Sequence, residues 1–347
     1  VECAGVAYLN LFVSELIAQC IFYFTHHICR GPLQGFVDYG NISLAEVDAC
    51  SAMNRCAEHI EVLNCNTKPD FFCTHLDVPY KVEDYSVEHM AIQVRLRLLD
   101  EFKNVYGVDV SDDAIRAAVK EHNELCDIIT ELSELRKLEN APITGYEFAI
   151  CTLVSYVCPT ALIMPYLKET LEEVKARELD PKPWYRARVA IVGSEIDDPE
   201  LIKLIEECGA FIVADRYCYG SNPGRERIEL NDEEDLVYQI CRHYMQTSQC
   251  ARYMSEEKIQ QRRDVADQLA REFGADGIIY EQMKYCDFWG FERALVSHIM
   301  AEEYGWPVLS IDRLYNAKGS GQLRTRFQAF VESLEIKKIQ KARKGGK

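Results

Sequence analysis

The sequence has few basic residues for its number of acidic ones. Across 347 residues, 39 Lys and Arg stand against 56 Asp and Glu, which gives a formal net charge of −17. A protein that binds nucleic-acid phosphates needs a basic surface, so this negative net charge argues against a general nucleic-acid-binding protein. It does not exclude small anionic ligands, because a local cluster of Arg and Lys can override the net charge. The hydrophobic fraction of 48% excludes a disordered chain, and the length indicates about two domains.

The sequence also lacks the local motifs of several enzyme classes. Gly193-Ser194-Glu195 is not continued as the GxGxxG of a dinucleotide site, and neither the GxSxG of serine hydrolases nor the HExxH of zinc enzymes is present. The run from Gly319 to Arg326 opens a predicted helix but lacks the GK[ST] ending of a P-loop. Its glycines and arginines suit a phosphate-bearing ligand, although a capped helix with surface arginines explains the run equally well.

The fifteen cysteines include no CxxC pair and extend from Cys3 to Cys286. A disulfide scaffold is short and dense, so this distribution predicts a reducing, cytoplasmic compartment in which most cysteines are small buried hydrophobic residues. The uncharged stretch 148–167 is long enough to span a membrane. It contains Pro159 and Pro165 and has no flanks rich in Lys or Arg, so a buried helix and loop is the preferred interpretation, and no membrane contact is predicted.

The second half of the sequence alternates short apolar runs with amphipathic helices. This alternation predicts a Rossmann-like, doubly wound parallel sheet over residues 184–347. Helical periodicity dominates residues 86–183, which we predict to be a helical segment, and residues 1–85 are expected to form an N-terminal α/β domain. The predicted strands of the second half cover residues 188–193, 210–214, 276–280 and 307–311.

Four loops follow the predicted strands, and ligands of open α/β sheets bind at the carboxyl ends of the strands. Two of these loops contain a cysteine, and Cys286, just past the third strand, is placed where a thiolate could ligate a metal. Its position alone favours chance over metal ligation, because one of fifteen cysteines can fall in such a loop without a function there. The loops are Gly193-Ser194-Glu195, Arg216 to Gly220, Lys284 to Asp287, and Asp312-Arg313.

Several stretches, taken together and in order, give the chain a family resemblance. They are Ile28-Cys29, Asn54-Arg55-Cys56, His75 to Pro79, Cys218 to Ser221, Tyr285-Cys286-Asp287, and Gly321 to Glu332. The sequence resembles the 2-hydroxyacyl-CoA dehydratase / benzoyl-CoA reductase family over nearly its whole length. The family's usual N-terminal segment is shortened here and the first residue is Val1, so we expect a truncated start.

The resemblance implies two Rossmann-like domains with a helical part between them, and a [4Fe-4S] cluster held by three cysteines from distant positions. Matched one by one, the ligands are Cys29, Cys56 and Cys286, with the fourth iron left to water, another small ligand or the substrate. Cys50 is the alternative to Cys56, which is preferred because Asn54 precedes it as in the family pattern. Ligands so far apart explain why no ferredoxin-like CxxC motif is present.

The implied function is that of an iron–sulfur subunit of an oxygen-sensitive 2-hydroxyacyl-CoA dehydratase, a lyase that removes water by radical elimination to give an enoyl-CoA. A separate ATP-dependent iron–sulfur activator supplies the electron, and a related second subunit completes a heterodimer or larger complex. Gln322, Thr325 and Arg326 are candidate contacts for the acyl-CoA substrate, and no catalytic residue is assigned. The alternatives are a subunit of an ATP-dependent benzoyl-CoA reductase, a non-catalytic cluster-bearing relay or assembly subunit, and a cluster-free α/β protein whose cysteines only pack.

Overall fold

The computed structural model describes residues 44–47, 73–221, 226–284, 286–314 and 321–345. The chain divides into two compact units, which we describe separately. Unit 1 combines Val1–Glu124 with Glu226–Ser255, and unit 2 combines Leu125–Arg225 with Glu256–Lys347. Helix α7 (Asp112–Glu134) begins in unit 1 and ends in unit 2.

In its described part, unit 1 contains a parallel strand pair and a helical layer. Leu44 of the first strand is paired with Cys73 of the second. Helix α11 packs on α5, and the apolar side chains of Val87, Met90 and Ile240 are buried. In chain order, the elements are β1 (Leu44–Val47), β2 (Cys73–Leu76), α5 (Asp84–Gln93), a π-helical segment (Val94–Leu99), α6 (Asp100–Tyr106), the start of α7, and α11 (Leu236–Thr247).

Unit 2 begins with helices and continues as alternating strands and helices. The Thr144 hydroxyl accepts a bond from the Glu147 amide, and the Glu147 carboxylate accepts one from the Thr144 amide, so this capping box fixes the start of α8. In chain order, the elements are a 3₁₀ turn (Leu135–Lys137), α8 (Gly145–Val157), α9 (Thr160–Ala176), β3 (Ala187–Gly193), α10 (Glu200–Glu207), β4 (Ala210–Arg216), α12 (Glu256–Glu272), β5 (Gly277–Met283), α13 (Asp287–Glu302), β6 (Val308–Arg313) and α14 (Gly321–Gly345).

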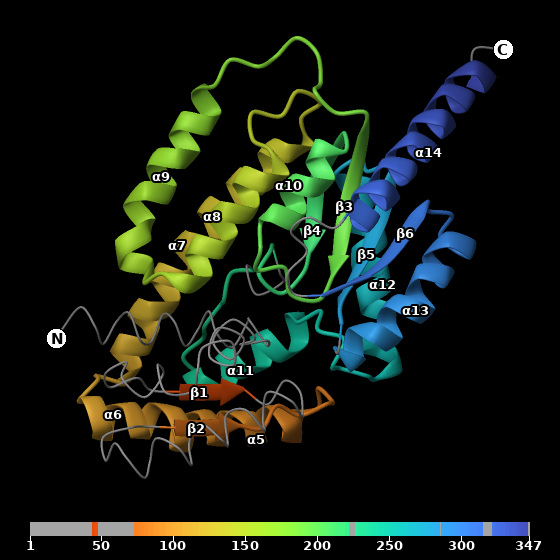
Figure 1. Cartoon of the computed structure of the whole chain (residues 1–347). Coiled ribbons are helices and arrows are strands. Elements are labelled where there is room, and N and C mark those ends of the chain that lie inside the picture. The colour runs from red at the N-terminus through yellow and green to blue at the C-terminus, as the bar shows by residue number, and fades with distance from the viewer. Residues whose placement is uncertain (1–43, 48–72, 222–225, 285, 315–320, 346–347) are drawn as a thin grey trace, which may run out of the picture. The chain divides into compact units, whose positions relative to one another are not determined.

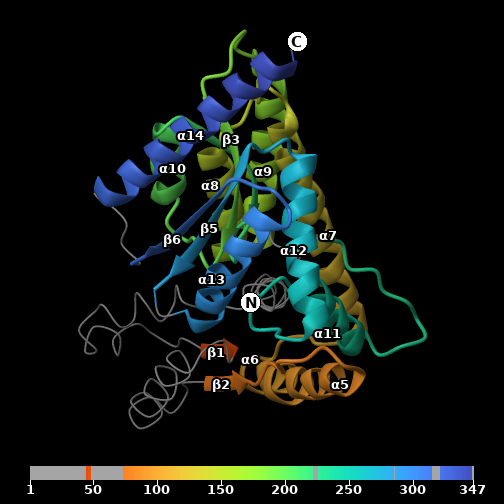
Figure 2. The same cartoon turned by 90° about the vertical axis from the view of Figure 1, so that its right-hand side faces the viewer.

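The sheet of unit 2 is fully parallel, with strand order β4-β3-β5-β6. Helices α10 and α14 cover one face, and α12 and α13 cover the other (Figures 1 and 2). Because both faces are covered, β3 and β4 are almost continuously buried, which is why their sequences are apolar runs. The chain leaves β3 toward β4 and leaves β5 toward β6, so a topological switch point lies between the carboxyl ends of β3 and β5.

The structure confirms the predicted α/β class and the parallel sheet of the second half. A second Rossmann-like domain stays a prediction, since the described part of unit 1 contains only the β1–β2 pair. The uncharged stretch 148–167 belongs to two helices, α8 and α9, that are separated at Cys158-Pro159. None of the helices within the described ranges is long and apolar enough to cross a membrane.

Candidate functional site

The carboxyl ends of the four parallel strands bring together the four loops that follow them. Ser194, after β3, is at the centre: its carbonyl accepts a bond from the Cys218 amide at 3.4 Å, and its hydroxyl accepts one from the Met283 amide at 2.6 Å. The Lys284 amide in turn donates to the Arg313 carbonyl at 2.7 Å. The convergence predicted from the sequence is therefore present in the structure.

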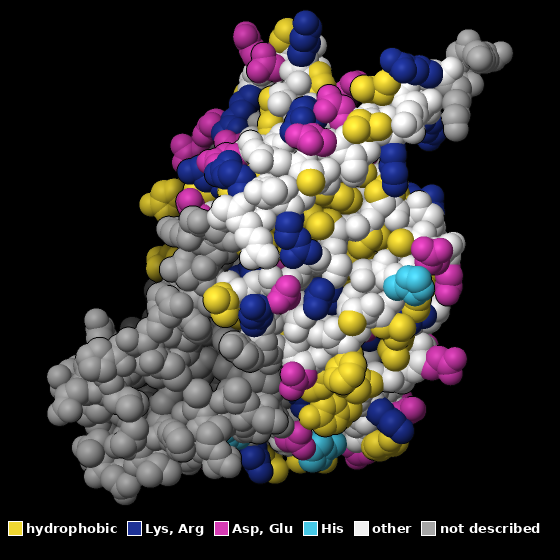
Figure 3. All heavy atoms as spheres, turned by 45° about the vertical axis from the view of Figure 1, so that its right-hand side comes forward, with side chains coloured by type: hydrophobic (Ala, Val, Ile, Leu, Met, Phe, Trp, Pro, Cys, Tyr) yellow, Lys and Arg dark blue, Asp and Glu magenta, His cyan; other side chains and the backbone are white. Residues whose placement is uncertain are grey.

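A buried set of charges lies beneath these loops. Glu281 on β5 forms an ion pair with Arg313 at the end of β6, with 2.7 Å between Oε1 and Nε, and both side chains are at most 1% exposed. The Ser194 hydroxyl donates to the second carboxylate oxygen of Glu281 at 2.8 Å. On the face drawn in Figure 3, acidic and basic side chains are interspersed at the surface. Charged side chains buried as deeply as Glu281 and Arg313 are rare in proteins and are nearly always paired.

Glu195 is the exception within this buried set. Its side chain is 1% exposed, and no other residue in the described part of the chain donates a hydrogen bond to either oxygen of the Glu195 carboxyl. Arg313 donates to the Glu195 backbone carbonyl at 2.6 Å, not to its side chain. Burial, with the negative charge of Glu281 added to it, raises the pKa of Glu195 to about 8.

This raised pKa predicts that protein stability depends on pH through Glu195. The folded protein holds the proton more tightly than the unfolded chain, whose pKa is near 4.5. The resulting stabilisation is complete below the unfolded pKa and is lost as the pH rises through the folded pKa. Glu195→Gln has no such proton, so its stability should increase relative to the wild type between about pH 5 and about pH 8, by up to a few kcal/mol. Urea unfolding of both proteins across this range measures the difference, and a constant difference would contradict the assignment.

Gly193 allows β3 to approach β5 closely at this edge. A Cβ atom at position 193 would lie 2.2 Å from the Glu281 carbonyl oxygen and 2.8 Å from its Oε2. The first of these contacts is with backbone, so no side-chain rotation can relieve it. The glycine is therefore required by the same strand pair that positions Ser194 and Glu281.

We predict that Gly193→Ala destabilises the protein by about 3 kcal/mol or more, because the β3–β5 pair must separate to make room. The matched control is Gly321→Ala at the start of α14, where an added Cβ meets no atom within 4 Å. Chemical unfolding measures both variants. Equal stability of the two variants would show that the strand pair tolerates the added atom.

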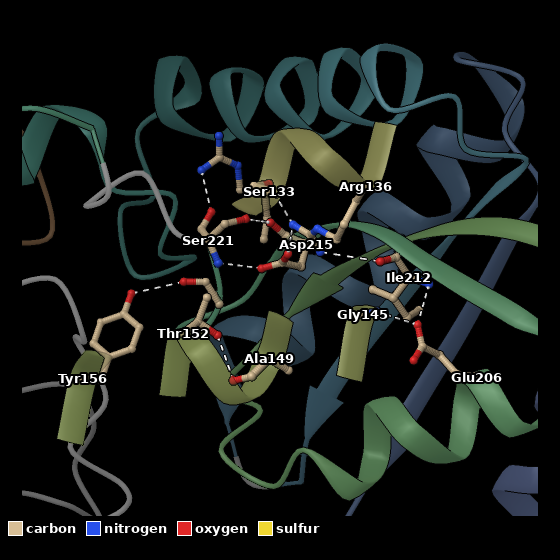
Figure 4. Close-up of polar contacts among 12 residues, drawn as sticks. Ser133, Arg136, Gly145, Ala149, Thr152, Tyr156, Glu206, Ile212, Asp215 and Ser221 are labelled. Atoms are coloured by element: carbon tan, nitrogen blue, oxygen red, sulfur yellow. Dashed lines mark hydrogen bonds and ion pairs between the residues drawn. The ribbon is translucent and has the colours of Figure 1, made fainter. Parts of the chain in front are cut away.

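A second buried network fixes the loop after β4 (Figure 4). Arg136, in the turn after α7, forms an ion pair with Asp215 near the end of β4; the Nη2–Oδ1 distance is 2.7 Å and both side chains are 1% exposed. The second carboxylate oxygen of Asp215 accepts the Ser221 amide at 2.5 Å, and the Tyr156 hydroxyl donates to the Gly220 carbonyl at 3.2 Å. These bonds hold the loop from Tyr217 to Ser221, which carries Cys218.

Cys286 lies at the N-cap of α13, in the short loop that follows the end of β5 at Met283. It is partly exposed, whereas Cys218 on the neighbouring loop is buried. The Cys286 carbonyl accepts a hydrogen bond from the Gln282 side-chain amide at 3.2 Å. The Arg293 Nε donates to the side-chain oxygen of Gln282 at 2.8 Å. The start of a 16-residue helix favours negative charge, so this position suits a thiolate.

The other predicted metal ligands cannot be located, because Cys29, Cys56 and the alternative Cys50 lie outside the described residues. Among the described residues, no group of three or more His, Cys, Asp or Glu side chains could hold a metal ion. At Cys286, the thiol donor, its partial exposure and its position at a helix start suit a thiolate ligand of a cluster.

The predicted CoA contacts all lie in the first two turns of α14. Gln322 and Thr325 are exposed, and the Thr325 hydroxyl donates to the Gly321 carbonyl at 2.9 Å. The Arg326 guanidinium is committed to the Ser310 carbonyl on β6. The neighbouring Arg324 forms an exposed ion pair with Glu207 at 2.6 Å.

Sequence reasoning missed the buried ion pairs. Two of the residues carry a recognisable signal, because Glu281 and Asp215 are acidic residues within the apolar strands Gly-Ile-Ile-Tyr-Glu-Gln-Met and Ala-Phe-Ile-Val-Ala-Asp-Arg. A charged residue in a strand covered on both faces must find a partner. Arg136 carries no such signal, since it follows an amphipathic helix in which a surface arginine would be equally expected.

The fold and the strand-end loops define an α/β protein whose parallel sheet has a topological switch point, the place where ligands of such sheets usually bind. Over residues 15–334, the sequence matches the family described as 2-hydroxyglutaryl-CoA dehydratase, D-component, and the chain belongs to this family. This match confirms the resemblance seen in the sequence.

Two relatives show the range of the family. The beta subunit of (R)-phenyllactyl-CoA dehydratase from Clostridium sporogenes is 26% identical over 242 residues, covering 68% of this chain and 61% of that subunit. A benzoyl-CoA reductase subunit from Thauera aromatica is 23% identical over 273 residues, covering 77% of this chain and 69% of that subunit. The chain thus spans about three-fifths of the first relative and about two-thirds of the second.

Proposed function

We propose that this chain is the iron–sulfur subunit of an oxygen-sensitive 2-hydroxyacyl-CoA dehydratase, which eliminates water to give an enoyl-CoA. The observation that carries the proposal is the position of Cys286 at the helix-capped edge of the sheet, within a chain of this family. The dehydratase subunit from Clostridium sporogenes supports the choice of reaction. Unit 1 is proposed to be the second Rossmann-like domain, and the protein is proposed to work in the cytoplasm.

Cys29, Cys56 and Cys286 are the residues proposed to hold a [4Fe-4S] cluster. With three protein ligands, such a cluster supplies an open iron that acts as a Lewis acid and a centre for one-electron chemistry. The chain itself positions Cys286 through the bonds that its carbonyl accepts from Gln282 and from the Gly290 amide. Ser194 and Glu281 fix the adjoining edge.

The substrate and partners follow from the same proposal. The exposed side chains of Gln322 and Thr325 are available to contact the CoA portion of an acyl-CoA. Arg326 would first have to release the Ser310 carbonyl, so we propose it as the weakest of the three contacts. A related second subunit and an ATP-dependent iron–sulfur activator complete the proposed system, in which the activator delivers the electron for the radical elimination.

A second candidate function is that of a benzoyl-CoA reductase subunit, and the similarity to the Thauera aromatica protein favours it. Turnover with a 2-hydroxyacyl-CoA, compared with turnover with benzoyl-CoA, separates the two enzymes. A non-catalytic relay or assembly subunit would carry iron without responding to either compound.

The test is to prepare the protein without oxygen, restore its iron and sulfide, and record absorption and EPR spectra with and without acyl-CoA. The proposal expects about four irons per chain and a spectrum that changes on adding a 2-hydroxyacyl-CoA. Iron without a spectral change would favour the relay subunit. Absence of iron after anaerobic reconstitution would overturn the proposal and leave the cysteines as packing residues.

A further inference from the structure

Two buried polar groups at the switch point have no partner among the other residues that the structure describes. One is the carboxyl group of Glu195, which follows β3; the other is the indole N–H of Trp289 in the first turn of α13, which follows β5. Glu195 is 1% exposed and Trp289 is 4% exposed. Buried polar groups are nearly always hydrogen-bonded, and exceptions gather at functional sites.

The other deeply buried carboxylates of unit 2 show how unusual Glu195 is. Glu281 is bonded to Arg313 and Ser194, and Asp215 to Arg136 and Ser221. Each of these carboxylates has both a cation and a hydrogen-bond donor from another residue. Among the described residues, no other residue donates a hydrogen bond to the Glu195 carboxyl, although Arg313 lies close enough to bond the Glu195 backbone carbonyl.

The same pattern holds farther from the switch point. Glu206 accepts bonds from the amides of Gly145 and Tyr146, at 2.8 and 3.1 Å. Glu292 accepts two bonds from the Arg262 guanidinium. Of these five described carboxyl groups, Glu195 is the one to which no other residue donates a hydrogen bond.

The charges around Glu195 influence whether its carboxyl group is protonated. Glu281 and Asp197 act on it as negative charges, and Arg313 is the positive one. The Arg313 guanidinium is already shared between the Glu281 carboxylate and the Glu195 backbone carbonyl. A proton on Glu195 removes the repulsion between acidic neighbours and gives its carboxyl group an O–H donor.

We propose that Glu195 is a protonated acid of the strand-end site and donates its hydrogen bond to the carbonyl oxygen of a bound acyl thioester. A neutral carbonyl suits this position, because Glu281 and Asp197 would repel an anionic ligand group and the cation that acts on Glu195, Arg313, is already engaged by Glu281. A carboxylic acid kept neutral in an apolar site is a known kind of hydrogen-bond donor to a carbonyl oxygen. The thioester as ligand rests on the proposed function, whereas the proton on Glu195 does not.

The first test asks whether Glu195 carries a proton. Infrared difference spectra of the full chain, recorded from acidic to alkaline pH, should contain a carbonyl band of a protonated carboxylic acid that persists at neutral pH and disappears near pH 8. Glu195→Gln should lose this band, while the exposed-site control Glu207→Gln should keep it. Identical neutral-pH bands in the wild type and Glu195→Gln would overturn the proposal.

The second test asks whether the Glu195 carboxyl group donates a hydrogen bond to the thioester carbonyl oxygen. The iron-loaded full chain is titrated with an acyl-CoA and with its thioether analogue, which lacks the carbonyl oxygen. The wild type should prefer the acyl-CoA about tenfold. Glu195→Ala should lose the preference, and Glu195→Gln, which retains an N–H donor, should keep most of it.

The outcomes separate this inference from the proposed function. Acyl-CoA binding with the same preference in the wild type and in Glu195→Ala would overturn the role of Glu195 and leave the dehydratase proposal intact. If the wild type binds neither compound, the proposed function fails and the thioester assigned to Glu195 fails with it. In that case a persisting infrared band would still establish the buried proton.

Discussion

On the proposed cluster assignment, Cys286→Ala is expected to reduce the iron content from about four irons per chain to near zero after anaerobic reconstitution. The variant would leave the proposed cluster with two of its three proposed cysteine ligands, Cys29 and Cys56. The folded protein should survive, because Cys286 is partly exposed and its backbone bonds to Met283 and Gly290 do not involve sulfur. Iron and acid-labile sulfide analysis measures the result directly.

The matched control is Cys158→Ala. Cys158 is also partly exposed and also lies at a helix end, but at the C-terminus of α8 and not at a helix start. It should retain the full iron content. If both variants retained equal iron, Cys286 would not be a ligand and the proposed cluster site would be wrong.

The second large effect is expected at the Arg136–Asp215 ion pair. Asp215→Asn leaves the Arg136 guanidinium buried without its counter-charge, and such a loss costs about 3–5 kcal/mol. Besides stability, the variant should lose the order of the loop from Tyr217 to Ser221, because the same carboxylate accepts the Ser221 amide. Urea unfolding measures the stability, and hydrogen exchange of the loop amides measures the loop.

A double-mutant cycle tests whether the charge itself is responsible. Arg136→Met removes the buried cation and keeps an unbranched side chain over the Phe148 ring, where the guanidinium now lies 3.6 Å from the ring centroid. Adding Arg136→Met to Asp215→Asn should therefore recover part of the lost stability. Additive losses would show that the two residues act independently. The exposed pair Arg324–Glu207 is the control, and its disruption should cost less than about 1 kcal/mol.

The parallel sheet of unit 2 was predictable because its strands are buried on both faces. A strand that is buried on both faces consists of consecutive apolar residues, which can be recognised in the sequence. The four predicted strands lie within β3, β4, β5 and β6 or overlap them closely. The loops after these strands could be named in advance for the same reason, since parallel strands place their carboxyl ends at one edge.

Other elements carried a weaker local signal. Helix α11 was missed, because its sequence interrupts the strand–helix alternation and belongs to unit 1 instead. The last helix, α14, continues to Gly345, because its lysine-rich final turns remain helical without a buried apolar face. The pairing of Arg136 with Asp215 joins residues far apart in the sequence, and no spacing rule connects them.

Because unit 1 and unit 2 are interleaved along the chain, the ribosome synthesises part of unit 2 before unit 1 is complete. Residues 226–255 complete unit 1, yet they are synthesised between β4 and β5 of unit 2. β3 pairs with β4 on one edge and with β5 on the other, so one edge of β3 stays open while residues 226–276 emerge. An open edge of an apolar strand invites pairing with other chains. We therefore expect the nascent chain to depend on chaperones until β5 is released, and the strand-end loops to be the last part of unit 2 to assemble.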